Sequence, residues 1–139
     1  MMRGRCHCGN ISYELQTELA EPPLRACQCS FCRMHAARSI SDPAGRLVFD
    51  VEDESLLSRY RFGLATADFL VCRRCGAYAG AFMDGYGIAN ARLLETALLR
   101  EPSPVSYDGE TAEQRIARRR ERWTPGEIRI RAPRATSGS

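Results

Sequence analysis

Apolar and polar residues alternate along several short stretches of the chain, and residues that favour turns separate these stretches. The clearest alternation covers residues 11–16, where every second side chain is apolar, as in a half-buried strand. Asp42–Gly45 and Asp84–Gly87 have the composition of turns. Further strands are expected over 24–27, 38–41, 47–51, 56–62, 68–71 and 77–83. Many short strands with turns between them predict a mainly β fold.

Helical patterns are confined to short segments. Residues 111–122 are expected to form a short C-terminal helix, with Thr111 as its cap and a thin apolar stripe. Residues 30–34 are expected to form a single helical turn capped by Ser30. The leucine-rich residues 91–100 suit either a helix or a buried irregular segment.

The length and composition are those of one ordinary globular domain. A chain of 139 residues with 44% hydrophobic and 27% charged residues can bury a core without cross-links. Because there is no internal repeat or long linker, we expect one domain over 1–125 and a C-terminal tail over 126–139. The first residues have no apolar run of the signal-peptide kind, and no window is long enough to span a membrane, so a cytoplasmic protein is expected.

The basic residues are all arginine, and they are unevenly distributed. Because none of the 20 is lysine, no lysine can form a Schiff base with a carbonyl substrate. Residues 1–110 carry 12 arginines against 14 acidic residues, whereas residues 111–139 carry 8 against 3. This basic end supports an alternative function, a zinc-stabilised binding module that uses residues 115–134 to contact nucleic acid or an acidic partner. Only Trp123 is nearby to stack on bases and acidic residues interrupt the patch, so a solvated helix face is the preferred interpretation.

The candidate chemistry lies in seven cysteines that fall into three groups, namely Cys6/Cys8, Cys27/Cys29/Cys32 and Cys72/Cys75. In a reducing compartment, cysteines at such spacings indicate metal ligation rather than disulfides. In the triplet, two side chains alternate onto one face of an extended segment, and a turn can bring the third toward the same point. Three soft donors at one point favour Zn²⁺, and buried free thiols are the alternative.

The two pairs together make a four-thiolate site, and the triplet makes a three-thiolate site. Cys72-x-x-Cys75-Gly76 has the form of a zinc knuckle, in which glycine permits a backbone angle that a side chain would resist. A closed four-thiolate site has no free position, so its role is in folding. A three-thiolate site leaves a fourth position to water or substrate. Three negative ligands make zinc a weak Lewis acid that suits a sulfur ligand, which predicts a thiol substrate.

The sequence allows more than one role for other polar side chains beside the cysteines. His35 follows the triplet at ligand-like spacing and would close the site, although we expect the fourth position to be open. His7 points to the opposite face from its neighbouring cysteines and has no assigned role. Three arginines could offset thiolate charge or bind a carboxylate substrate, with solvated surface positions as the alternative; these are Arg33, Arg73 and Arg74.

These motifs resemble those of the glutathione-dependent formaldehyde-activating enzymes, a family that also includes centromere protein V. The resemblance spans about residues 4–125. The residues that carry it are Gly4-x-Cys6-x-Cys8-Gly9, Tyr13-Glu14, Cys27-x-Cys29-Ser30-x-Cys32-Arg33, Cys72-x-x-Cys75-Gly76, Asn90–Glu95 and Tyr107–Pro125.

The resemblance implies a β-tent fold of packed antiparallel sheets around two zinc ions per chain. It places a structural zinc on Cys6, Cys8, Cys72 and Cys75, and a catalytic zinc on Cys27, Cys29 and Cys32. The implied reaction joins glutathione and formaldehyde into S-(hydroxymethyl)glutathione and is classed as that of a carbon–sulfur lyase. The implied partners are a small-molecule thiol and an aldehyde, rather than nucleic acid or a membrane. Zinc would hold the thiolate close to the aldehyde carbon, and proximity would supply the remaining acceleration.

Overall fold

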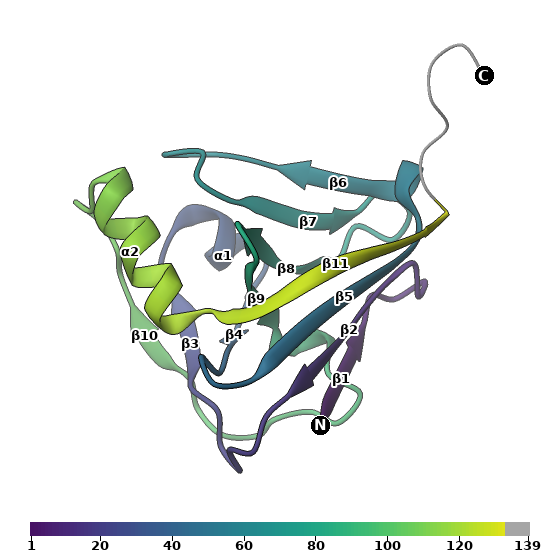
Figure 1. Cartoon of the computed structure of the whole chain (residues 1–139), viewed down its shortest axis with the longest axis horizontal. Coiled ribbons are helices and arrows are strands. Elements are labelled where there is room, and N and C mark those ends of the chain that lie inside the picture. Colours follow the sequence, from purple (N-terminus) through teal and green to yellow (C-terminus); the bar gives the residue numbers. More distant parts are fainter. Residues whose placement is uncertain (133–139) are drawn as a thin grey trace.

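Short strands joined by tight turns make up most of residues 1–132, the part of the chain that the computed structural model describes (Figure 1). The helices are α1 (Ser30–Met34) and α2 (Ala112–Arg122), with single 3₁₀ turns at Glu54–Leu56 and Ala91–Leu93. The strands are β1 (Met2–Arg5), β2 (Ile11–Gln16), β3 (Leu24–Cys27), β4 (Ser39–Ile40), β5 (Arg46–Asp53), β6 (Leu57–Tyr60), β7 (Asp68–Cys72), β8 (Tyr78–Met83), β9 (Tyr86–Asn90), β10 (Ser103–Val105) and β11 (Thr124–Ala132). The mainly β prediction is therefore confirmed.

The strands are linked in one branched sheet. Its main path runs β1-β2-β5-β11-β9-β4-β3-β10, and β8, β7 and β6 follow from β9 as a side branch. Most neighbours are antiparallel, as expected, but β11 pairs with β5 and β10 pairs with β3 in parallel. In Figure 1, α2 lies beside β10 and β3 on one flank of the molecule.

The alternation that predicted β2 produces the main core. Ile11, Tyr13 and Leu15 are at most 1% exposed, and they lie opposite buried residues of β5 in the antiparallel register. The Tyr13 ring meets the Phe49 ring edge-on, with 6.0 Å between the centroids. The Tyr13 hydroxyl donates to the carbonyl oxygen of Asn90, so the one polar atom of this buried ring is satisfied.

The end of the described chain is a strand rather than the tail expected from residue 126. β11 lies between β5 and β9, and its parallel register with β5 places Ile128 opposite Phe49. Ile128 and Ile130 are partly buried and pack against the main core, while the intervening residues are charged. The predicted boundary at 125 is therefore wrong, because this alternation is that of a half-buried strand. Residues 133–139 of the expected tail lie outside the described residues.

The short helical elements follow the sequence with one correction. Thr111 caps α2, and Thr111 and Gln114 form a reciprocal capping box. Cys29, not Ser30, caps α1, because the Cys29 sulfur accepts the backbone N–H of Cys32. Residues 91–100 are irregular after the 3₁₀ turn at Ala91–Leu93, as one alternative expected, but they are not buried throughout, since Leu99 is 92% exposed. Within residues 1–132, the helices are too short or too polar to cross a membrane.

Candidate metal centres

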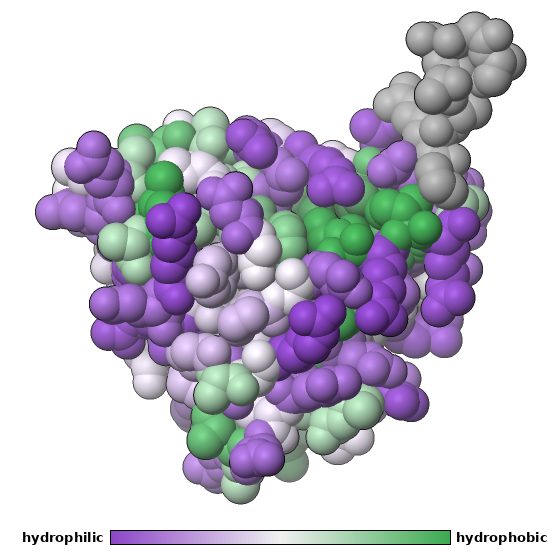
Figure 2. Space-filling view, in the orientation of Figure 1, coloured by the Kyte–Doolittle hydropathy of each residue, from purple (hydrophilic) through white to green (hydrophobic). Residues whose placement is uncertain are grey.

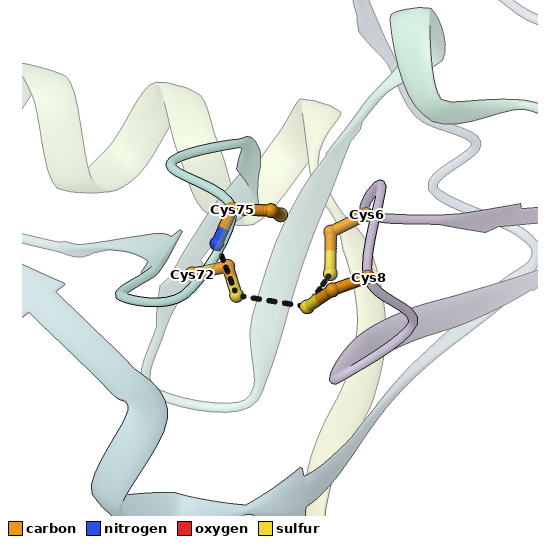
Figure 3. Close-up of side chains that lie close together, drawn as sticks. All are labelled: Cys6, Cys8, Cys72 and Cys75. Atoms are coloured by element: carbon orange, nitrogen blue, oxygen red, sulfur yellow. Dashed lines mark hydrogen bonds between the residues drawn. The ribbon is translucent and has the colours of Figure 1, made fainter.

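Two turns that are distant in sequence bring four cysteines together (Figure 3). Cys6 and Cys8 lie in the turn between β1 and β2, and Cys72 and Cys75 lie where β7 turns toward β8. Their four sulfur atoms lie within 4.8 Å of one another. The Cys8 sulfur is 3.8 Å from that of Cys6 and 3.5 Å from that of Cys72. Four sulfurs at tetrahedral corners about 2.3 Å from a zinc ion are about 3.8 Å apart, so the donor set fits such an ion.

Glycines form the turns that aim these sulfurs. Gly9 and Gly76 follow the second cysteine of each pair and have φ angles of 85° and 80°, in the left-handed region. Each glycine N–H donates to the carbonyl oxygen of the first cysteine of its pair, over 3.0 Å to Cys6 and 2.8 Å to Cys72. The backbone angle predicted at Gly76 is confirmed.

Burial and backbone donors give the four thiols unequal acidities. Burial raises the pKa of Cys6 and raises that of Cys72 to about 12. At Cys75 burial acts in the opposite direction to the net shift, and the backbone N–H groups of Cys8 and Ala77 lower the pKa to about 6. A cation among the sulfurs would favour all four as thiolates, so binding of a metal ion would release protons.

The cysteine triplet, Cys27, Cys29 and Cys32, forms the second cluster. These residues come from the end of β3, the cap of α1 and α1 itself, and their sulfurs also lie within 4.8 Å of one another. Hydrogen bonds from the thiols of Cys27 and Cys32 lower the pKa of Cys29 to about 2, whereas hydrogen bonds with Cys27 and Cys29 raise the pKa of Cys32. The triplet could hold a metal ion through three protein ligands. All seven cysteines are free of disulfides, and they divide four and three in space as they do in the sequence.

His35 does not belong to the ligand group of the triplet. Its Nδ1 atom is 2.9 Å from the carbonyl oxygen of Phe31, and its ring lies 4.3 Å from the Phe31 ring. Within residues 1–132, no histidine or carboxylate joins the three sulfurs. His7 is exposed. The three cysteines are therefore the whole donor set that the described residues supply.

A cavity that is partly open to solvent adjoins the triplet. All three cysteines line it, whereas the four-cysteine cluster does not. Aromatic residues of the wall are Phe62, Phe69, Tyr78, Tyr107 and Trp123, and the arginines of the wall are Arg25, Arg115, Arg118, Arg119 and Arg122. A small molecule in this cavity would meet the triplet, an aromatic surface and several positive charges.

The arginines expected beside the ligands are not those that line the cavity. Arg33, Arg73 and Arg74 are exposed and do not line it, which fits the solvated alternative. Four of the five arginines that do line it come from α2, where positions 115, 118, 119 and 122 share a face at helical spacing. This helical spacing of four arginines can be seen in the sequence, and it could have predicted that they lie on one side of α2.

The interpretation of α2 as a solvated helix face is wrong for one side of the helix. Arg119 is only 6% exposed. Arg118 donates from two nitrogens to the two carboxylate oxygens of Glu110, over 2.8 and 3.0 Å, and Arg115 donates to the same carboxylate over 3.2 Å. In Figure 2, hydrophilic side chains lie over α2 and also over several other parts of the visible face. The basic residues of α2 are therefore divided between the cavity and the surface.

One solved structure of similar fold was found. The crystal structure of a Rhodobacter sphaeroides protein, from the Northeast Structural Genomics effort, matches with a TM-score of 0.59 and 29% sequence identity. The match covers 75% of this chain and 100% of that one. No family model matches the chain, and no curated protein matches it. The similarity supports the fold, and the description of that protein states no activity.

Proposed function

We propose that the chain is a zinc-dependent enzyme of the carbon–sulfur lyase class that joins a thiol to an aldehyde. Glutathione and formaldehyde, which would give S-(hydroxymethyl)glutathione, are the first pair to test. The observation that carries the proposal is the different placement of the two cysteine clusters. The triplet lines a solvent-open cavity, whereas the four-cysteine cluster lies away from that cavity. Catalytic zinc sites keep a position for substrate, and structural sites do not.

In this proposal, Cys6, Cys8, Cys72 and Cys75 hold a structural zinc ion that ties the β1–β2 turn to the β7–β8 turn. Cys27, Cys29 and Cys32 hold a second zinc ion. When bound there, zinc would supply a soft acid that lowers the pKa of a substrate thiol. A four-thiolate set has no place for a substrate, which is why the catalytic role falls to the triplet.

The side chains around the triplet would do the remaining work. The reaction forms a carbon–sulfur bond, and the thiol proton ends on the former carbonyl oxygen. Tyr78 lines the cavity and belongs to the buried cluster that packs against the three cysteines. Its hydroxyl makes no hydrogen bond within residues 1–132, so it is available to donate to that oxygen. Phe62, Phe69 and Trp123 would exclude water and hold the two reactants at reacting distance.

Exchange NMR of glutathione with ¹³C-formaldehyde tests the proposal. Protein loaded with two zinc ions should accelerate adduct formation well beyond the spontaneous reaction at the same pH. Tyr78→Phe should keep both metal ions and lower the enzymatic rate about 10-fold or more, because one hydrogen bond to the developing oxyanion is lost. An unchanged rate with fully loaded wild-type protein would remove glutathione and formaldehyde as the substrate pair.

A further inference from the structure

We propose that Arg119, supported by Arg25 and Arg122, forms a subsite for a carboxylate of the thiol substrate. The thiol part of this inference rests on the proposed function, whereas the carboxylate part rests on the arginines that line the cavity. It narrows the substrate to thiols that carry a negative charge at some distance from the sulfur.

Arg119 is a buried cation with incomplete hydrogen bonding. Its side chain lines the cavity, and its Nε atom is buried and has no partner within residues 1–132. Nη1 donates to the Thr66 hydroxyl over 2.6 Å, and the Cζ atom lies 4.7 Å from the centre of the Trp123 ring. These two contacts fix the plane of the guanidinium and leave its Nε edge without an acceptor. Buried donors without acceptors are rare in proteins because each costs free energy, which indicates that a ligand completes this one.

No carboxylate within residues 1–132 forms an ion pair with Arg119. Among residues 1–132, Arg119, Arg25 and Arg122 form no ion pair, whereas Arg115 and Arg118 share Glu110. Arg25 makes its hydrogen bond to the neutral hydroxyl of Ser41. Burial lowers the pKa of Arg119 to about 10, and the nearby charges of Arg118 and Arg115 add to this shift, so the group stays protonated at neutral pH.

The negative charges that face the arginines are too few to balance them. Asp108 lines the cavity and is exposed, and the Glu110 carboxylate is already shared by two arginines. Three thiolates around a divalent ion leave one net negative charge at the triplet. Five arginines therefore exceed the three negative charges by two. Like charges in a partly buried cavity repel one another, and a bound anion relieves that repulsion.

A carboxylate is the anion that fits best. The guanidinium presents parallel N–H donors that match the two oxygens of a carboxylate. Arg119 and the triplet line the same cavity, so one small molecule can place its sulfur at the cysteines and its carboxylate at the Arg119 guanidinium. A neutral thiol would leave both the charge and the Nε donor of Arg119 unsatisfied.

The test compares two thiols that differ only in charge. 3-Mercaptopropionate carries the carboxylate, and methyl 3-mercaptopropionate lacks it. Titration calorimetry with zinc-loaded protein should show at least 10-fold tighter binding of the acid by the wild type. Arg119→Gln should abolish this preference without weakening the binding of the ester, and Arg119→Lys should restore part of the preference. Arg120→Gln is the matched control, because Arg120 is exposed, does not line the cavity and should leave both affinities unchanged.

A second readout separates a binding role from a structural one. The ¹⁵N–¹H signal of Arg119 Nε, assigned by its loss in Arg119→Lys, should shift when 3-mercaptopropionate or propionate is added and should not shift with the ester. If Arg119→Gln fails to fold, Arg122→Gln replaces it, because Arg122 is exposed. This variant should bind 3-mercaptopropionate about 3-fold more weakly than the wild type does. Equal binding of acid and ester by the wild type, or a stronger Nε response to inorganic phosphate than to propionate, would overturn the carboxylate subsite.

The two proposals fail in different ways. If neither thiol binds while propionate still shifts the Arg119 signal, the thiol function is wrong and the carboxylate subsite stands. If both thiols bind equally and Arg119→Gln changes neither, the subsite is wrong and the thiol function stands.

Discussion

Cys72→Ser should destabilise the domain far more than Cys29→Ser. Cys72 is 1% exposed and belongs to the main core, at the end of β7. Its sulfur contacts that of Cys8, 64 residues earlier in the chain. Serine offers a harder and shorter donor, so the four-thiolate set would lose one of its ligands. The β1–β2 turn and the β7–β8 turn would then lose much of their common anchor.

The size of the effect follows from the energies of such sites. Structural zinc ions in small sites contribute about 10–16 kcal/mol of apparent binding free energy, and whole domains are stable by only about 5–15 kcal/mol. Losing about a quarter to a third of the zinc contribution removes about 3–5 kcal/mol. For a domain of this size, 1 kcal/mol corresponds to about 3–5 °C, so the melting temperature should fall by about 10–20 °C.

Cys29→Ser is the matched comparison, because it removes one thiol from the other cluster. The triplet lies within one short segment whose members the chain already holds together, and all three line the open cavity. Serine at position 29 can still accept the N–H of Cys32 as the cap of α1. We expect a change of only a few degrees, together with loss of the second zinc ion and of thiol-dependent activity.

Circular dichroism melting curves and a colorimetric zinc assay on the two purified variants test whether the two substitutions differ in stability and in zinc content. Both should be measured under reducing conditions at equal zinc concentration. If the two substitutions lower the melting temperature equally, the triplet is also structural, and the division of roles between the clusters is refuted.

Three further outcomes are expected. The zinc-loaded chain should hold two zinc ions, and the one at the triplet should leave first on titration with a chelator, because three ligands bind less tightly than four; a single class of zinc would contradict this. His35→Ala should keep both metal ions and the activity, because the His35 ring contacts Phe31 rather than the sulfurs; loss of one zinc would show that it is a ligand. Hydrogen bonds from Arg118, and then Arg115, lower the pKa of Glu110, so this carboxylate stabilises the fold at neutral pH and loses that effect as the pH falls through its folded-state pKa. Glu110→Gln should therefore lower the melting temperature by a few degrees at pH 7, with a difference that shrinks in acid. Glu18→Gln is the control, because Glu18 is exposed and forms no ion pair within residues 1–132, so its melting temperature should match that of the wild type.

The elements that the sequence predicts well are those whose signal is local. Ile11, Tyr13 and Leu15 alternate within one strand, and the alternation alone decides which face is buried. Thr111 and Gln114 form their capping box within one helical turn. The spacing within each cysteine group likewise restricts where the sulfurs can point, and free thiols at such spacings have few other structural uses.

β11 had a local signal that the sequence interpretation missed. Ile128 and Ile130 alternate with charged residues, much as the apolar residues of β2 alternate with polar ones, but the sequence interpretation assigns the segment to the C-terminal tail. Charge on the outward face of a strand is compatible with burial of the other face. The parallel pairing with β5, by contrast, has no local signal, because it depends on where the chain returns after α2.

The composition of the cavity depends on β10, a strand of three residues that contains a proline. The sequence Glu101–Pro104 reads locally as the end of a segment, since proline cannot donate to a sheet. At the edge of the sheet, however, β10 pairs in parallel with β3 and places Val105 opposite Cys27. The Gln28 N–H donates to the Val105 carbonyl oxygen over 2.9 Å, so this connection is fixed beside the triplet. The chain continues from Val105 through Tyr107 into α2, and this path brings Arg119 to the wall that the cysteines share. The cysteines alone indicate residues that could hold a metal ion, whereas the proposed carboxylate subsite depends on a helix whose approach follows a three-residue pairing beside the triplet.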